Sequence, residues 1–206
     1  MFTSGQFCGT VDKSKAGGQD EEATKCQVDS VGLSRLSAET LAMSMQVHPE
    51  QNPMTGLEGR ANLLINLGKA LTENTNGYFL GELKEGQSVV LPRPGNMVDW
   101  LAKHPTTTKD AQSGATTVQV SALWEVLIVG LAPIWPATRT KLDGVSLGDV
   151  WLCESFKKEL GERAGKDDEK ALVPFHKLTQ WLAYSIMEPM EQTLGWKFAG
   201  GEHQTG

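Results

Sequence analysis

The segment from Val173 to Pro189 constrains the fold most, because its polar and apolar residues recur with the period of an amphipathic helix. Pro174 suits the first turn of such a helix, where its missing N–H is not needed. At about 100° per residue, one face is apolar and is predicted to be core: Phe175, Leu178, Leu182 and Ile186. The other side carries a polar stripe: Lys177, Gln180, Tyr184, Glu188 and Glu191. The segment therefore predicts a two-sided helix.

The polar stripe has two interpretations. Most polar stripes on amphipathic helices simply face water. A solvent face more often consists of runs of Glu and Lys, whereas this stripe combines a cation, an amide, a phenol and a carboxylate beside the indole of Trp181. That mixture favours a binding site for a small polar ligand. His176 lies off the stripe, and we interpret it as a cap or packing residue, because a single histidine at a helix start is more often structural than catalytic.

A second polar and aromatic stretch lies between two tryptophans, Trp135 and Trp151, and is interrupted by glycines. Its charged residues include Arg139, Lys141, Asp143 and Asp149. Asp143 and Asp149 also have structural interpretations. Asp143 precedes a glycine, and Asp-Gly is a common tight-turn pair; Asp149 can be the N-cap of a following helix. Burial raises the pKa of a carboxyl group and a nearby cation lowers it, so one site can separate an acid from a base. The stretch is therefore compatible with acid–base hydrolysis.

Charge and cysteine content narrow the function classes. The formal net charge of -6 and the pI near 5.3 argue against nucleic-acid and anionic-membrane partners, which usually require a basic surface. Cys8, Cys26 and Cys153 have no C-x-x-C spacing, so they predict neither a zinc site nor a disulfide framework and fit a reducing cytoplasm. Polar residues and Pro133 break the most apolar window, 118–135. We therefore expect neither a signal peptide nor a membrane span.

The first half of the chain is predicted to be helical after an irregular start. Residues 1–30 show no periodicity. Ser37 predicts the N-cap of a helix that runs through Met45, and the capping-box spacing of Thr55 and Glu58 predicts a helix over 55–74. Two brief strands are predicted at 78–83 and 88–91. The rigid turn Pro92-Arg93-Pro94-Gly95 then leads into a further helix, and it places Arg93 either towards a ligand or in solvent.

The second half follows the same pattern. A polar linker over 106–117 precedes an apolar run, 118–131, that predicts a central buried helix ended by Pro133. The charged residues 157–170 predict a surface insertion or a solvated helix. The fold class is therefore mainly α, a helical domain with at most a few short strands. We expect one domain, with an irregular segment over 1–30, a helical region over 31–196 and a tail over 197–206.

The sequence lacks the common motifs for nucleotide binding and for zinc hydrolysis. It contains no G-x-G-x-x-G, P-loop or H-E-x-x-H pattern. The prediction of a phosphate-cradling loop or of zinc hydrolysis therefore has no support, and we expect no metal and no cofactor.

Five segments resemble the uracil-catabolism protein four family, a fungal and bacterial family: Asn52–Arg60, Arg93–Gly95, Ala132–Pro136, Leu142–Trp151 and Leu172–Pro189. The resemblance implies a role in degrading uracil that has been attached to ribose. It further implies hydrolysis of a ribosyl-urea type intermediate to urea and a ribose moiety, and a distant fold likeness to helical glycosylases. Because members of that family are longer, the chain is expected to correspond to the C-terminal half of the family domain.

The reaction implied by the resemblance assigns roles to the residues of both stretches. Cleavage at ribose C1 passes through an oxocarbenium-like state, which a carboxylate stabilises while an acid protonates the leaving group. We predict Asp143 or Asp149 as the stabiliser or water activator and Glu188 as the acid. The predicted ligand contacts are Arg139, Lys177, Gln180, Tyr184, Trp181 and Arg93. Two alternatives stay open: a noncatalytic protein that binds the metabolite or a pathway partner, and an inactive fragment.

Overall fold

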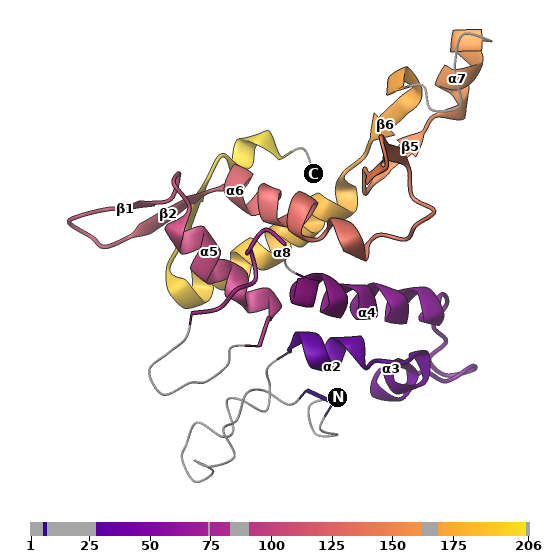
Figure 1. Ribbon diagram of the computed structural model, residues 1–206, viewed down its shortest axis with the longest axis horizontal. Coiled ribbons are helices and arrows are strands. Elements are labelled where there is room, and N and C mark those ends of the chain that lie inside the picture. Colours follow the sequence, from indigo (N-terminus) through magenta and orange to yellow (C-terminus); the bar gives the residue numbers. More distant parts are fainter. Residues whose placement is uncertain (1–5, 8–27, 74, 83–90, 162–168, 205–206) are drawn as a thin grey trace. The chain divides into compact units, whose positions relative to one another are not determined.

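The computed structural model describes residues 6–7, 28–73, 75–82, 91–161 and 169–204. This part of the chain is mainly helical with a few short strands, as predicted (Figure 1). It forms two compact units, Met1–Lys103 and His104–Gly206. The boundaries predicted for a single domain stay a prediction, as does the likeness to glycosylases, and the predicted irregular segment falls mostly outside the described residues.

Side chains cap the first helices of the Met1–Lys103 unit. In α2, Ser30–Ser34, the Asp29 carboxylate accepts a hydrogen bond from the Gly32 N–H at 2.7 Å. In α3, Ala38–Ser44, the Ser37 hydroxyl accepts one from the Thr40 N–H at 3.0 Å, which confirms the predicted cap. Each bond satisfies a helix N–H that has no partner within its own helix.

The long helix of this unit is α4, Leu57–Glu73, and its existence confirms the prediction over 55–74. It packs against α2, and the two helices lie side by side (Figure 1). A Cβ atom at Gly68 would lie 2.6 Å from the Ser34 backbone nitrogen, so only glycine fits there. Leu33 of α2 and Leu71 of α4 are buried in the core.

The end of the first unit differs from the prediction. Tyr78 and Phe79 lie in a turn, so the strand predicted over 78–83 is wrong in its described part, and the one over 88–91 lies outside the described residues except for its last. Tertiary contacts bury these aromatic residues: Tyr78 packs edge-on against Trp100, with ring centroids 4.8 Å apart. The predicted turn into a helix is confirmed, since a 3-10 helix, Pro94–Asn96, leads into α5, Met97–Lys103.

A three-stranded sheet opens the His104–Gly206 unit. β1, Thr108–Lys109, and β2, Thr116–Gln119, form an antiparallel hairpin, so the linker predicted over 106–117 is wrong. β2 also pairs in parallel with β7, Lys197–Ala199, with Val118 opposite Phe198. Pairing with a strand from the far end of the sequence is a long-range contact that local polarity does not predict.

The predicted buried helix follows this sheet and is confirmed. It consists of α6, Val120–Glu125, and a π-helical continuation, Val126–Gly130, and a 3-10 helix, Ala132–Ile134, comes next at Pro133. Leu123, Val126 and Leu127 are almost fully buried. Val129 is 45% exposed, so the run is not buried all round.

Two short hairpins and a surface helix come next. β3, Lys141–Leu142, pairs antiparallel with β4, Val145–Ser146, and β5, Val150–Leu152, pairs antiparallel with β6, Leu172–Pro174. α7, Glu154–Leu160, has no buried residue, which confirms a solvated element in the described part of 157–170.

The last long helix is α8, Lys177–Leu194, and it packs on the π-helical segment with a face that the sequence did not predict. Pro174 belongs to β6, so the helix begins later than predicted. Phe175 is 61% and Leu178 49% exposed, so their placement in the core is wrong. The buried residues of α8 are Thr179, Gln180, Ala183 and Met190. Thr179 and Ala183 are small and Gln180 is polar, so a pattern of large apolar residues does not mark the buried face. Within the described residues, no helix combines the length and apolarity needed to cross a membrane.

Candidate ligand-binding site

A cavity of about 580 Å³ lies in the His104–Gly206 unit, at the carboxyl ends of the parallel strands β2 and β7. Ligands of open sheets with parallel strands often bind beyond the carboxyl ends of those strands. The cavity is lined mainly by polar and aromatic side chains: Gln119, Ser121, Trp124, His176, Gln180, His203 and Gln204, with Val120, Ala199, Gly200 and Glu202. The size is typical of a small-molecule site.

The two strand ends fix one wall of the cavity. Gln119 ends β2 and is paired with Ala199, the last residue of β7. Gly200 follows with φ 87, a left-handed conformation that turns the chain into the 3-10 helix Gly201–His203. The Gln204 N–H then donates to the Gly201 carbonyl at 3.1 Å. These bonds hold the described part of the predicted tail, 197–204, against β2.

His176 faces the cavity from the start of α8. Its backbone is left-handed, with φ 51 and ψ 13, a conformation that is strained for most residues but more frequent for histidine. The ring packs edge-on against Trp124, with centroids 5.7 Å apart. Its Nδ1 atom is buried and has no hydrogen-bond partner within the described residues. His176 occupies the N-cap position but makes no side-chain cap bond, so the contact with Trp124 supports the packing alternative of our interpretation and not the capping one.

Gln180 and Gln204 bring two carboxamides to the same cavity. Gln180, a predicted ligand residue, is only 7% exposed, and its N–H donates to the His176 carbonyl at 2.8 Å in the first turn of α8. Both side-chain polar atoms of Gln204 are buried without a hydrogen-bond partner in the part of the chain that the structure describes. Gln204 was not predicted as a site residue because it lies beyond the last helical pattern. Trp124 was not predicted because it lies in the apolar run 118–131, which we assigned to the core.

Asp149 connects the cavity to the predicted polar stretch. Its carbonyl accepts hydrogen bonds from the Phe175 N–H at 3.1 Å and the His176 N–H at 3.3 Å. Its buried carboxylate accepts from the indole N–H of Trp151 at 2.8 Å and from the Leu178 N–H at 3.4 Å. Asp149 therefore caps the N-terminus of α8, a helix that is distant in sequence, whereas the N-cap interpretation placed it before a helix that follows it directly. It holds the segment that carries His176.

Arg139 lies beside Asp149's partner Trp151. Its guanidinium carbon is 4.3 Å from the centroid of the Trp151 ring and 5.3 Å from that of the Trp135 ring. Such cation–π contacts stabilise a guanidinium away from an anionic partner. The Nη1 atom is buried and has no hydrogen-bond partner among the described residues. Arg139 does not line the cavity.

The remaining predicted site residues do not line this cavity. Asp143 is exposed in the two-residue turn between β3 and β4, with φ 49 followed by φ 83 at Gly144, as its turn alternative requires. Lys177, Trp181 and Tyr184 are exposed on α8, and Glu188 is exposed and accepts a hydrogen bond from Gln192 at 3.1 Å. Glu188 lies eight residues beyond Gln180, about 12 Å along the helix axis. Arg93 is half-buried in the other unit. The ligand contacts predicted for these residues stay predictions.

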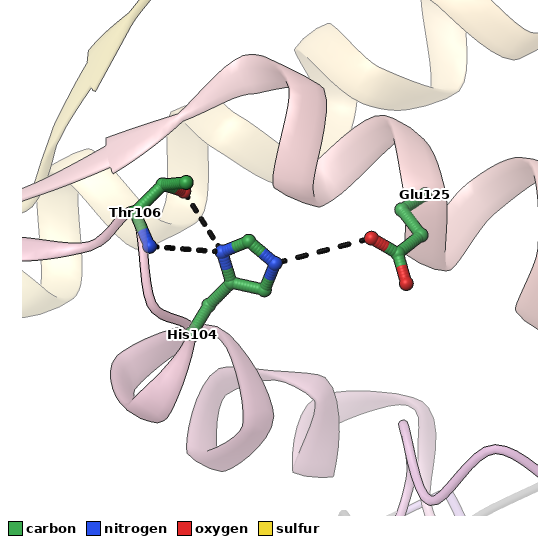
Figure 2. Close-up of polar contacts among 3 residues, drawn as sticks. All are labelled: His104, Thr106 and Glu125. Atoms are coloured by element: carbon green, nitrogen blue, oxygen red, sulfur yellow. Dashed lines mark hydrogen bonds and ion pairs between the residues drawn. The ribbon is translucent and has the colours of Figure 1, made fainter.

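A separate polar cluster joins the start of this unit to α6 (Figure 2). The Nδ1 atom of His104 lies 2.8 Å from the Thr106 hydroxyl and accepts from the Thr106 N–H at 3.3 Å, while Nε2 lies 3.9 Å from the Glu125 carboxylate. Because a backbone N–H donates to Nδ1, the neutral ring carries its proton on Nε2, towards Glu125. The cluster fixes the turn before β1. Among the described residues, no group of three or more His, Cys, Asp or Glu side chains could hold a metal ion.

Comparison with known proteins places the whole chain in one family. Residues 1–206 match the family described as protein of unknown function DUF1688, and the chain belongs to it. It is 40% identical over 184 residues to Uracil catabolism protein 4 of Lachancea kluyveri, a match that covers 88% of this chain and 38% of that protein. It is 34% identical over 180 residues to Protein urg3 of Schizosaccharomyces pombe, which covers 87% of this chain and 35% of that protein. The chain thus spans less than two fifths of either relative. No solved structure matches it.

Proposed function

We propose that this chain acts in uracil catabolism and that its cavity binds a ribosyl-urea type compound. The name of the Lachancea kluyveri relative supports the pathway, and the sequence resemblance described above supports the ligand. The observation that carries the proposal is the cavity at the ends of β2 and β7, where carboxamides, a hydroxyl and imidazoles surround one indole wall. A ribosyl-urea is uncharged, polar and partly flat. Carboxamides, a hydroxyl group and an aromatic face match such a ligand.

The proposed reaction is hydrolysis of the C–N bond at ribose C1. The oxygen of water bonds to C1 and gives up one proton, and the electron pair of the broken C–N bond leaves with the ureido nitrogen, which takes up a proton to give urea. Charge at C1 develops through an oxocarbenium-like state. In this proposal His176 transfers the proton, because imidazole is the side chain that most often does so in catalysis. Glu202, a carboxylate that lines the cavity, stabilises the charge at C1.

Asp149 takes a different role from the one predicted for it. Both of its carboxylate oxygens accept hydrogen bonds from the protein, from Trp151 and from Leu178. A carboxylate engaged in this way is suited to hold α8 and His176 in place. We therefore propose Asp149 as a positioning residue for the site. The complete protein's activity is part of the proposal, since the relatives extend far beyond the matched region.

One observation favours a second candidate, binding without turnover. The Asp149 carbonyl accepts a hydrogen bond from the His176 N–H, but both oxygens of the buried Asp149 carboxylate already accept hydrogen bonds from the protein. Glu202, the carboxylate that lines the cavity, is exposed. A noncatalytic protein of the pathway could hold the metabolite in the same cavity. The two candidates differ in whether urea is released.

The test follows urea release from synthetic ribosylurea by this chain and by full-length Uracil catabolism protein 4. Release by both supports hydrolysis within these 206 residues. Release by the relative alone, with binding of ribosylurea by this chain, supports a site that further segments complete. Binding without release by either protein supports the noncatalytic candidate. Absence of both binding and release overturns the proposal.

The variant His176→Asn separates the imidazole from the backbone of residue 176. Asparagine tolerates the left-handed conformation, so the start of α8 keeps its geometry while the proton-transferring ring is lost. The variant His48→Asn removes an exposed imidazole in the other unit and serves as the matched control. If this chain releases urea, we expect a loss of at least about a hundredfold in rate for His176→Asn, in the range of general acid–base catalysis. No loss would remove His176 from the reaction.

A further inference from the structure

The side chain of Gln204 is an unusual feature of the cavity. Its Nε2 and Oε1 atoms are both buried, and neither has a hydrogen-bond partner in the described chain, although Gln204 lines the cavity. Buried polar groups in proteins are nearly always paired, because a buried donor or acceptor without a partner is unfavourable. A carboxamide with both ends unpaired at a cavity wall indicates that a ligand supplies the partners.

The backbone holds Gln204 in a fixed place at this wall. Its N–H donates to the Gly201 carbonyl at 3.1 Å, closing the 3-10 helix that follows β7. β7 in turn pairs with β2, with Ala199 opposite Gln119. The side chain therefore projects from a segment whose backbone is already held by hydrogen bonds before a ligand arrives.

The chemistry of a carboxamide defines its complement. It has an acceptor oxygen and a donor nitrogen side by side, so the matching ligand group carries a donor and an acceptor side by side. A ureido group or a primary carboxamide does so. A phosphate or carboxylate group offers only acceptors when ionised and would leave the Oε1 atom unpaired. The chemistry of Gln204 thus favours a ligand group with an adjacent donor and acceptor, such as a ureido or carboxamide group.

We propose that Gln204 is the residue that recognises the ureido end of the ligand, through a pair of hydrogen bonds to its N–H and C=O groups. The proposal rests on the proposed function for the identity of the ribosyl part. Gln180, a second buried carboxamide, lines the same cavity and belongs to the same recognition surface. The sugar then extends away from Gln204.

The experiment measures binding by calorimetry with three probes: ribosylurea, N-methylurea and ribose, which has no ureido group. The variants are Gln204→Met, which keeps the length of the side chain without its polar atoms, and Gln204→Glu, which replaces the donor with an acceptor. Gln192→Met is the matched control, because Gln192 is an exposed glutamine of α8 outside the cavity. Circular dichroism and urea unfolding of each variant show whether it is folded, and Gln204→Glu keeps the size and shape of the side chain if Gln204→Met does not fold.

We expect both Gln204 variants to bind ribosylurea at least about tenfold more weakly, while ribose binding and the Gln192 control do not change. Equal binding of ribosylurea by the parent chain and the folded Gln204 variants overturns the proposal and leaves the proposed function standing. Binding of N-methylurea that depends on Gln204, without binding of ribosylurea, supports the recognition of ureido groups and overturns the proposed function. No binding of either ureido probe overturns both.

Discussion

Replacement of Gly68 by alanine tests the packing of the first unit. The added Cβ would lie 2.6 Å from the Ser34 backbone nitrogen and 2.8 Å from the Ser30 carbonyl oxygen, and real Cβ atoms do not approach so closely. Because both neighbours are backbone atoms of α2, they cannot rotate away, and the helices must separate. Overpacking of this kind typically costs about 1–3 kcal/mol, and we expect the upper part of that range.

The opposing effect is the higher helix propensity of alanine, which contributes about 1 kcal/mol. The net prediction for Gly68→Ala is a free energy of unfolding lowered by about 2 kcal/mol. Gly59 provides the matched control, since it is also in α4 but a Cβ there meets no atom within 4 Å. We expect Gly59→Ala to raise the free energy of unfolding by up to about 1 kcal/mol.

Urea unfolding followed by circular dichroism measures both variants against the parent chain, and hydrogen exchange of the α2 and α4 amides locates the change. Gly59→Ala should unfold at a higher urea concentration than the parent and Gly68→Ala at a lower one. If Gly68→Ala is as stable as the parent, α2 and α4 are not in the close contact described here, and the reasoning is refuted.

Three further predictions concern the second unit. Asp149→Ala removes the acceptor of the Leu178 N–H and of the Trp151 indole N–H. In urea titrations it should lower the free energy of unfolding by about 1–3 kcal/mol, and Asp149→Asn should lower it by less. Arg139→Met loses contacts with two indole rings and should cost about 1–2 kcal/mol and alter tryptophan fluorescence; unchanged stability would count against those contacts. Hydrogen bonds from the Ser113 hydroxyl and N–H hold the pKa of Asp110 below its ordinary value of 3.8. The ionised carboxylate therefore stabilises the fold above the ordinary pKa, and this stabilisation is lost as the pH falls through the lower pKa of the folded protein. In Ser113→Ala, an NMR titration should find the pKa of Asp110 raised.

Much of the helical structure was predictable from local signals. The Ser37 hydroxyl accepts a hydrogen bond from the Thr40 N–H, three residues later, so both partners of this cap lie in the same stretch of sequence. The prediction for α4 succeeded because its apolar residues recur with the helical period over several turns, and the buried run through Leu123 and Val126 was predicted because it is apolar nearly throughout. Errors arose where the partner of a segment is distant in sequence.

The helix α8 illustrates such an error. The sequence marks a face by its large residues, but the buried residues of α8 include Thr179 and Ala183, and Phe175 and Leu178 are exposed. Rotation of a helix by one residue, about 100°, exchanges these faces. Which face is buried depends on the shape of the neighbouring element, and a single segment does not contain that information.

The candidate site divides in the same way. The sequence alone determined which segments carry polar and aromatic groups, and it identified Asp149 and Gln180 as members of the site region, because composition and helical spacing are local properties. Only the tertiary structure decided that a strand from residues 197–199 pairs with β2, and so brought Gln204 to a cavity with His176. The physical reason is that parallel strand pairing and the capping of α8 by Asp149 join residues 29 to 80 positions apart, where the free energy of packing, and not local propensity, selects the partner.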